Sequence, residues 1–288
     1  MYTGNIPVCG MEMFDEGPDH FWIGELKAVS ALYPMLEIPH KNSFYSLVFV
    51  IAGSGELTVD ASGLILENSK AYIIKPGCIT TLISDDRTSG KMICFAEDFF
   101  SLRYNSNVLS QFSFFEREAK RSLSFTGPQQ QKVESLLSLL QEEYKNQGKA
   151  SAKVLRSYLN ILLFELERSY SPMLVLHSVT HSQEKIQEFE KLVEANYVMW
   201  KRPSIYAEQL NVSTNYLNKL CKKETGLTAG DLIRRHILLE AQRLLHYTRL
   251  TIGEISAKLG FENVSYFVTL FKKHMLHTPE EFRKSQNI

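Results

Sequence analysis

The sequence predicts an α+β protein with two domains: an N-terminal β-barrel or sandwich that carries a helical hairpin, and a C-terminal domain made only of helices. With 288 residues the chain exceeds one typical domain. Short β-branched and aromatic runs between about residue 20 and residue 96 indicate strands, and from residue 184 onward the apolar residues recur with helical spacing. We therefore expect domains at 1–170 and 184–288, joined by a linker at 171–183 that is rich in Ser, Thr and His.

Turn residues divide the β-rich stretch into strands. The segment FYSLVFVIAGSGELTVD predicts two strands joined through Gly53, Ser54 and Gly55. The segment AYIIKPGCITTLIS predicts another pair that turns at Pro76 and Gly77. Several short strands of this kind indicate a sandwich or a small barrel.

Two amphipathic helices are predicted next, at 129–146 and 152–169, and we expect them to form a hairpin. Their apolar stripes consist of Val133, Leu136, Leu137, Leu140 and Tyr144 on the first, and of Leu155, Leu159, Leu162 and Leu166 on the second. Ile161, Leu163 and Phe164 widen the second stripe. That helix should therefore be covered on more than one side, either by the β-domain or by a partner subunit.

Composition and charge exclude several classes of protein. No apolar run reaches the roughly 18 residues that span a bilayer, and the N-terminus lacks the features of a secretory signal, so we expect a cytoplasmic protein without membrane contact. The four cysteines lie far apart, which argues against a zinc knuckle or a disulfide framework. Residues 1–175 contain 16 Lys and Arg against 20 Asp and Glu, whereas the remainder contains 16 against 12. Only the second half should attract a polyanion.

One helical pattern occurs twice in the C-terminal half. Residues 217–223 (LNKLCKK) align with 267–273 (FVTLFKK) at an offset of 50, whereas upstream the offset is 49, so the second copy has a turn one residue longer. Each copy predicts a short helix, a tight turn and a second helix with an apolar inner face, as in a helix-turn-helix motif. A continuous helix over about 229–248 would join the two motifs into one rigid body.

Residues 184–288 resemble the DNA-binding domain of the AraC/XylS family of bacterial transcription regulators. The residues of the second copy that match the family pattern are Ile255, Ser256, Gly260, Phe261, Ser265, Tyr266, Phe267, Phe271, Lys272, Lys273, Thr278, Pro279, Phe282 and Arg283. The N-terminal half is similar, more weakly, to the cupin-like effector domain and helical hairpin of such regulators. The resemblance implies a sequence-specific transcriptional regulator, an activator or a repressor, that binds double-stranded DNA and RNA polymerase. Its N-terminal domain would either bind a small-molecule effector or serve only as a dimer platform or a docking surface for another protein. No cofactor and no enzymatic activity are expected, and the apolar stripe of the hairpin predicts a homodimer.

Helical geometry assigns an outward face to each second helix, which would read the DNA. The outward residues are Thr214, Asn215, Asn218, Lys219 and Lys222 in the first copy, and Val264, Ser265, Val268, Thr269 and Lys272 in the second, with Lys273 as a further phosphate contact. Asn can pair with adenine and Lys with guanine, whereas Val and the Thr methyl group pack against thymine methyl groups. The first motif should therefore carry most base discrimination, and the second should prefer an A·T-rich half-site. The alternative is that Val264 and Val268 pack inside the domain.

The strand region offers four candidate effector contacts, Trp22, His40, Tyr45 and Tyr72. The aromatic candidates could equally be ordinary core or rim residues. The alternative function, a cupin-type enzyme whose helical tail does not read DNA, needs a cluster of His and Glu ligands on the strands. The strands offer only His40, which we expect at the surface or at a pocket rim, so neither a metal site nor catalytic residues are predicted.

Three positions depart from the family pattern: Thr269 replaces Arg, Leu276 replaces Gly, and Cys221 replaces Phe. Gly226 can adopt a left-handed conformation at the end of the first reading helix without cost, whereas Leu276 in that conformation would cost roughly 1 kcal/mol. We therefore expect the turn at Leu276 to be built differently.

Overall fold

The protein folds into two compact units, Pro7–Ser178 and Val179–Ile288, and the second also includes Met1–Ile6. The structure is a computed structural model that describes residues 2–14, 20–85, 87–100, 108–115, 119–146, 148–170 and 181–286. Most of the linker expected at 171–183 lies outside the described residues. Its last three residues belong to a helix that begins at His181. The two units are described separately below.

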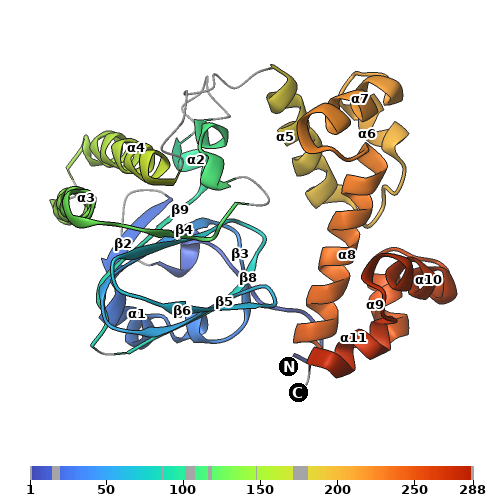
Figure 1. Ribbon diagram of the computed structural model, residues 1–288, viewed down its shortest axis with the longest axis horizontal. Coiled ribbons are helices and arrows are strands. Elements are labelled where there is room, and N and C mark those ends of the chain that lie inside the picture. Colours follow the sequence, from blue (N-terminus) through green and yellow to red (C-terminus); the bar gives the residue numbers. More distant parts are fainter. Residues whose placement is uncertain are drawn as a thin grey trace. The chain divides into compact units, whose positions relative to one another are not determined.

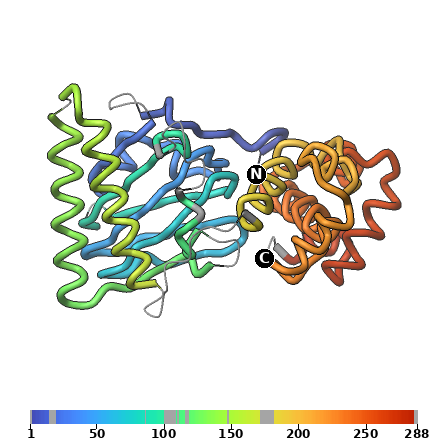
Figure 2. Tube along the Cα trace, turned by 90° about the horizontal axis from the view of Figure 1, so that it is seen from above, coloured from blue at the N-terminus to red at the C-terminus, as the bar shows by residue number. Residues whose placement is uncertain are grey.

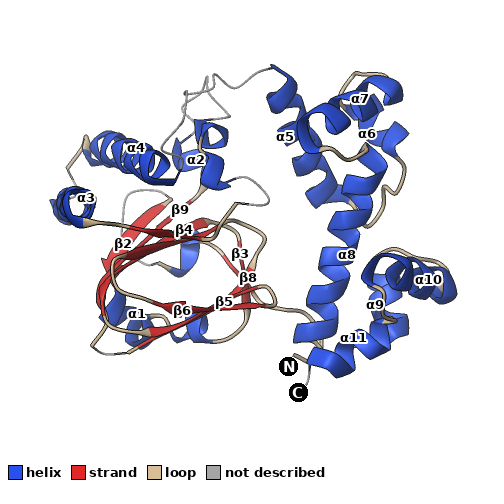
Figure 3. Ribbon diagram, in the orientation of Figure 1, coloured by secondary structure: helices blue, strands red, loops and turns tan. Residues whose placement is uncertain are grey.

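The first unit is built on two five-stranded sheets that face one another (Figure 3). Their orders are β1-β3-β8-β5-β6 and β10-β7-β4-β9-β2. The strands are Val8–Cys9 (β1), Phe21–Glu25 (β2), His40–Asn42 (β3), Tyr45–Ala52 (β4), Gly55–Val59 (β5), Ser62–Leu66 (β6), Lys70–Ile74 (β7), Ile79–Ser84 (β8), Ser89–Phe95 (β9) and Ser122–Ser124 (β10). Two short helices, Leu26–Leu32 (α1) and Glu97–Phe100 (α2), accompany them. The predicted sandwich is confirmed, without a closed barrel.

The two predicted turns carry the chain from one sheet to the other. β4 lies in the second sheet and β5 in the first, and the same holds for β7 and β8. Gly53 permits the first corner because its φ is +112° and an added Cβ would lie 2.5 Å from the Cα atom of Thr88. The strands predicted from the sequence are therefore confirmed, but consecutive strands do not pair as hairpins at these corners.

The helical hairpin consists of Gly127–Asn146 (α3) and Ser151–Tyr170 (α4) and lies against the sheets (Figure 2). Every residue predicted for the two apolar stripes is buried. Leu163 is also buried, and Phe164 packs against the same core. The rest of the first unit therefore covers a second side of α4. Ile161 remains 45% exposed.

Over its described residues, the second unit consists of helices and one isolated bridge. The helices are His181–Asn196 (α5), Pro203–Gln209 (α6), Thr214–Thr225 (α7), Ala229–Tyr247 (α8), Ile252–Lys258 (α9), Val264–Met275 (α10) and Pro279–Gln286 (α11). We call α6–α7 the first head and α9–α10 the second head. The two heads pack near opposite ends of α8, as Figure 1 shows. None of the helices in the described part of the chain combines the length and apolar character that a membrane crossing needs.

The first residues of the chain belong to the helical unit, although residues 1–170 were expected to form the N-terminal domain. The Tyr2 N–H donates to Tyr247 O at 2.9 Å, and the Arg249 N–H donates to Tyr2 O at 2.8 Å. These two bonds make a parallel bridge at the corner between α8 and α9. A six-residue segment carries no periodicity that could have predicted this pairing from the sequence.

The turn after α10 contradicts the expectation that it would be built differently. Leu276 has φ 65° and ψ −10°, close to the 76° and −7° of Gly226 after α7. Each residue donates its N–H to the carbonyl of the fourth residue before it, Lys272 and Lys222. Leu276 is 82% exposed, so little packing offsets its backbone cost.

Leu276→Gly should raise the free energy of unfolding by about 1 kcal/mol, because glycine adopts this conformation without steric strain. Urea unfolding of the full chain measures the change. The matched control, Gly226→Leu, should lower the free energy by a similar amount. A loss in both variants would show that the Leu276 side chain stabilises the fold through contacts that outweigh the strain.

Candidate nucleic-acid interface

We call the second helix of each head, α7 or α10, its reading helix. Both begin with a side-chain cap at the same place in the repeat. Ser213 Oγ accepts a hydrogen bond from the Tyr216 N–H at 3.1 Å before α7, and Asn263 Oδ1 accepts one from the Tyr266 N–H at 3.2 Å before α10. The turn runs from Leu210 to the cap in the first head and from Leu259 to the cap in the second. It is one residue longer in the second head, which confirms the prediction from the sequence offset.

The inner face of α7 is the predicted one. Leu217, Leu220 and Cys221 are buried. Burial raises the pKa of Cys221 to about 12, so its side chain is a neutral thiol that packs as a small apolar group.

The outer face of α7 presents three exposed polar residues, Asn215, Lys219 and Lys222, while Thr214 and Asn218 are half-buried. These exposed side chains offer the amide and ammonium groups that suit base edges and phosphates.

Asn218 differs from the other outward residues because it makes a tertiary contact. Its Oδ1 atom accepts a hydrogen bond from the backbone N–H of Ala229 at 3.1 Å, at the first residue of α8. Helical periodicity places Asn218 on the outer face but does not predict a bond to a neighbouring helix. The side chain therefore connects α7 to α8, and its acceptor oxygen is already engaged.

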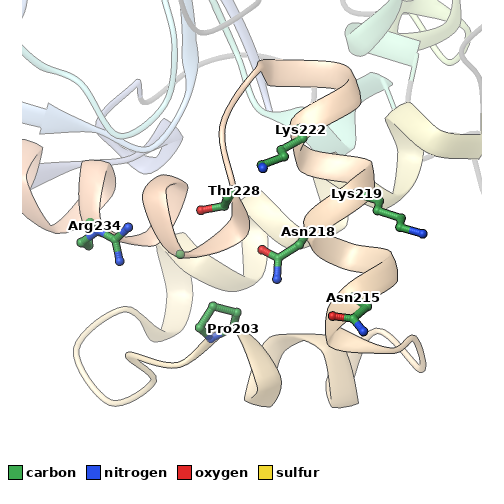
Figure 4. A pocket seen from close by; sticks show the side chains of 8 residues that line it. Pro203, Asn215, Asn218, Lys219, Lys222, Thr228 and Arg234 are labelled. Carbon is green, nitrogen blue, oxygen red and sulfur yellow. The ribbon is translucent and has the colours of Figure 1, made fainter.

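A basic hollow lies beside α7, with a volume of about 530 Å³ (Figure 4). Its lining comes from the start of α6, from α7 and from the start of α8: Pro203, Asn215, Asn218, Lys219, Lys222, Thr228, Gly230 and Arg234. Asp231 forms an ion pair with Arg234, and hydrogen bonds from Thr228, followed by this pair, lower the pKa of the Asp231 carboxyl. The contacts with Asp231 hold Arg234 and Thr228 beside the reading helix.

The outer face of α10 is less polar. Phe267 and Phe271 are buried inward. Val264 is 43% exposed, whereas Val268 is half-buried and packs against the core of the second head. The alternative was that both valines pack inside the domain. It is correct in part for Val268 and wrong for Val264.

The polar residues of α10 lie outward. Ser265, Thr269, Lys272 and Lys273 are exposed. The Thr269 hydroxyl donates to Ser265 O at 2.9 Å, so this donor is used within the helix. The second head therefore offers ammonium groups and apolar surface more than free hydrogen-bonding groups.

Two tyrosines were not among the residues predicted from the sequence. Tyr216 is 44% exposed and Tyr266 is 61% exposed, one turn into each reading helix. They occupy equivalent positions in the repeat, 50 residues apart. The repeat alignment contained this signal, but the apolar ring of tyrosine made it a poor candidate for the outward set.

The four candidate effector residues of the first unit do not form one cluster. The strand register places Trp22 and Tyr72 on one face of the second sheet and Tyr45 on the opposite face. Trp22 stacks on Phe14 with ring centroids 4.5 Å apart. The Tyr72 hydroxyl donates to Ile65 O at 2.7 Å.

His40 is buried, with 1% exposure, so its expected place at the surface or rim is wrong. β3 pairs with β1 on one side and β8 on the other, and His40 alternates with the half-buried Lys41 along the strand. Its Nδ1 lies 2.8 Å from Ile38 O, and its Nε2 lies 3.2 Å from Thr80 Oγ1. Burial lowers the pKa of His40, which keeps the ring neutral at pH 7. Over the residues that the structure describes, no group of three or more His, Cys, Asp or Glu could hold a metal ion.

Comparison with known proteins gives consistent matches. A family described as "Helix-turn-helix domain" matches residues 206–285, which include both reading helices. The Msm operon regulatory protein of Streptococcus mutans is 24% identical over 247 residues, covering 83% of this chain and 84% of its own. The HTH-type transcriptional activator RhaS of Salmonella schwarzengrund is 27% identical over 160 residues, so the match spans about half of each chain, 54% of this one and 55% of that one.

Solved structures also match. The C-terminal domain of the response regulator yesN from Fusobacterium nucleatum is 31% identical, with 35% of this chain and 98% of that chain covered and a TM-score of 0.33. ToxT from Vibrio cholerae matches 92% of this chain and 98% of its own at 16% identity, with a TM-score of 0.43. The duplicated motif on one shared helix and the regulators that match it support one assignment: residues 206–285 form a helix-turn-helix DNA-binding domain, and the chain is similar to transcriptional regulators of the AraC/XylS family.

Proposed function

We propose that the protein is a cytoplasmic, dimeric transcriptional activator that reads two DNA half-sites with its two heads and acts on RNA polymerase. The observation that carries the proposal is the sharing of α8 by two motifs with exposed reading helices. The name of the RhaS relative, a transcriptional activator, supports activation.

The two heads have different roles in this proposal. Asn215, Lys219 and Lys222 provide hydrogen-bonding groups, so the first head discriminates between bases. Lys272 and Lys273 anchor the second head to phosphates, and Val264 packs against a thymine methyl group. Val264→Ser should therefore weaken binding to a thymine-containing site and have no effect on the same site with uracil.

The length of α8 constrains how both heads reach the DNA. Its 19 residues span about 28 Å, whereas major-groove faces on one side of B-DNA recur about every 34 Å. Engagement of both heads therefore requires the DNA to bend, at a cost of a few kcal/mol. A circular-permutation assay that finds straight DNA in the complex would argue against it.

An effector site is proposed inside the β-sandwich, next to His40. His40, Asn42 and Thr80 are all buried, with exposures of 1%, 2% and 3%. Asn42 Nδ2 donates to Thr80 Oγ1 at 2.8 Å, and the Asn42 side chain also lies within hydrogen-bonding reach of His40. Because this cluster contains no ionised group, it suits a small uncharged polar molecule. A thermal-shift screen of sugars and polyols against carboxylates tests this, with Asn42→Leu as the variant that should abolish the response.

The DNA affinity should fall steeply with salt. Lys219, Lys222, Lys272 and Lys273 are exposed, and four phosphate contacts would lower the affinity by about a hundredfold between 50 and 200 mM salt. Binding of the full chain to a duplex selected from a random pool measures the slope. Lys222→Ala should reduce the magnitude of the slope by about 1, while Lys185→Ala on α5 should not change it. A flat salt response would contradict the proposal.

Two asparagines on α7 should behave differently. Asn215→Ala should leave stability unchanged and lose about 1–3 kcal/mol of discrimination at one base pair. Asn218→Ala leaves the Ala229 N–H without its acceptor, so it should lower stability by about 1 kcal/mol and weaken binding to all sequences alike. Urea unfolding and binding to a panel of single-base variants separate the two effects. Base-specific loss in Asn218→Ala would refute its structural role.

The hairpin should mediate dimerisation through its exposed apolar residues. Ile161 on α4 and Leu139 on α3 are 45% and 40% exposed. Ile161→Lys should convert a micromolar dimer into a monomer in sedimentation velocity, because a charge would be buried at the interface. Ile65→Lys on β6 is the matched control, since Ile65 is 70% exposed outside the hairpin. A monomeric wild-type protein would remove this part of the proposal.

A further inference from the structure

The loop that leads into the first head contacts the second head at a place other than α8. The loop between α5 and α6 contains Lys201, whose Nζ donates to Tyr197 O at 2.6 Å within the same loop. The same Nζ also donates to Leu259 O, at the end of α9 in the second head. One side chain thus bridges the segment that leads into the first head and the turn of the second.

Aromatic rings surround this bridge. The Nζ atom lies 4.9 Å from the ring centroid of Phe261 and 6.0 Å from that of Tyr197. Both rings pack against both cores of the unit. Burial lowers the pKa of Lys201 to about 8, which still leaves the ammonium form dominant at pH 7. The two carbonyl oxygens and the ring faces replace part of the water that this ammonium has lost.

The backbones fit closely at the same contact. Gly260, in the turn of the second head, has φ +76°, and an added Cβ would lie 2.0 Å from Val198 O. Val198 belongs to the same loop as Lys201. Only glycine permits both the conformation and this approach. We call the contact of Tyr197, Val198 and Lys201 with Leu259, Gly260 and Phe261 the clasp.

We propose that Lys201 is a positioning residue that fixes the angle and separation of α7 and α10, and so determines which spacing between two DNA half-sites the protein accepts. The inference rests on the proposed two-headed reading. The connecting helix fixes the separation of the two heads, but each head could still pivot about its own packing contact with that helix. A second contact away from that helix removes this freedom.

The spacing of half-sites is sensitive to small rotations. One base pair inserted between two half-sites moves them by about 3.4 Å along the axis and about 35° around it. Heads that pivot by this amount accept neighbouring spacings, whereas heads held by the clasp reject them. A clasp that only stabilises the fold would change the unfolding transition and leave this discrimination unchanged.

The test compares spacings on DNA. A bipartite duplex is selected from a random pool with the wild-type full chain, and duplexes with one base pair added or removed between the half-sites are then prepared. Lys201→Met keeps the length and apolar stem of the side chain and removes its donors. For each protein, the dissociation constant for the altered spacing is divided by that for the selected spacing. This ratio should be roughly 2- to 30-fold lower for Lys201→Met than for wild type. Binding to a duplex with only the first half-site should change less than twofold.

Matched variants separate positioning from charge and from stability. Lys201→Arg retains donors for both carbonyls and should retain the spacing ratio. Lys185→Met removes the same charge from α5, where Lys185 pairs with Glu188 at 2.8 Å, and should also retain it. Gly260→Ala should lose discrimination as Lys201→Met does. Gly226→Ala should not, because Gly226 has the same φ of +76° with no atom within 4 Å of the added Cβ.

A second readout does not depend on DNA binding. All four native cysteines are buried, so spin labels can be attached to cysteines introduced at the exposed positions Lys223 and Lys273 of the full chain. The distance distribution between the labels should be broader in Lys201→Met than in wild type. The inference would be overturned if Lys201→Met and wild type gave equal widths of the distance distribution and the same ratio of dissociation constants. It would also be overturned if Lys201→Met lowered stability but left that ratio unchanged. If the wild type tolerates all spacings, the two-headed reading fails, and the label widths alone decide whether Lys201 positions the heads.

Discussion

The C-terminal unit depends on one constraint: a single helix, α8, must serve two hydrophobic cores. Ile237 and Leu238 are neighbours in the chain, yet the first belongs to the core of the first head and the second to the core of the second. Consecutive helical residues point about 100° apart, so the helix must be apolar on more than one side. Among the described residues of α8, two charged side chains are buried, Glu240 and Arg243. They form an ion pair with each other. This pairing offsets the cost of removing two charges from water.

The two heads keep the same backbone geometry with different side chains. Ser213 and Asn263 cap the reading helices in the same way, and Gly226 and Leu276 end them in the same conformation. Packing against α8 constrains the inner faces, where Leu217 and Cys221 correspond to Phe267 and Phe271. The outer faces are less constrained, although Asn218 bonds to α8 and Val268 packs in part against the core. The repeat thus keeps one scaffold, while the exposed face proposed to meet DNA is polar in one head and largely apolar in the other.

Much of this fold could be predicted from the sequence because its signals are local. The hairpin stripes, the repeat, the longer second turn and the inner face of α7 all follow from periodicity within one helix or one motif. The sheet partners of β4 and β5 could not be predicted, since a corner between sheets and a hairpin turn use the same glycine-rich residues. The bridge at Tyr2 and the burial of His40 depend on partners far away in the chain.

The prediction at Leu276 failed for a different reason. We assumed that the chain would avoid a strained turn, whereas the geometry of the repeat retained it at a cost of about 1 kcal/mol. The outward set for DNA was predicted from helical angle alone. That criterion cannot distinguish a side chain that faces solvent, such as Asn215, from one that contacts another helix, such as Asn218.

The bond between Asn218 and the start of α8 limits how the specificity of this regulator can change. Under the proposed function, a substitution at Asn215 or Lys219 alters only the surface presented to DNA, so new target sequences are accessible there in single steps. A substitution at Asn218 also removes the acceptor that holds Ala229, so a new base preference at this position would come with a loosened junction between the reading helix and its support. Divergence of target sites by this scaffold should therefore proceed through the exposed positions of α7, with position 218 confined to side chains that can still accept that hydrogen bond.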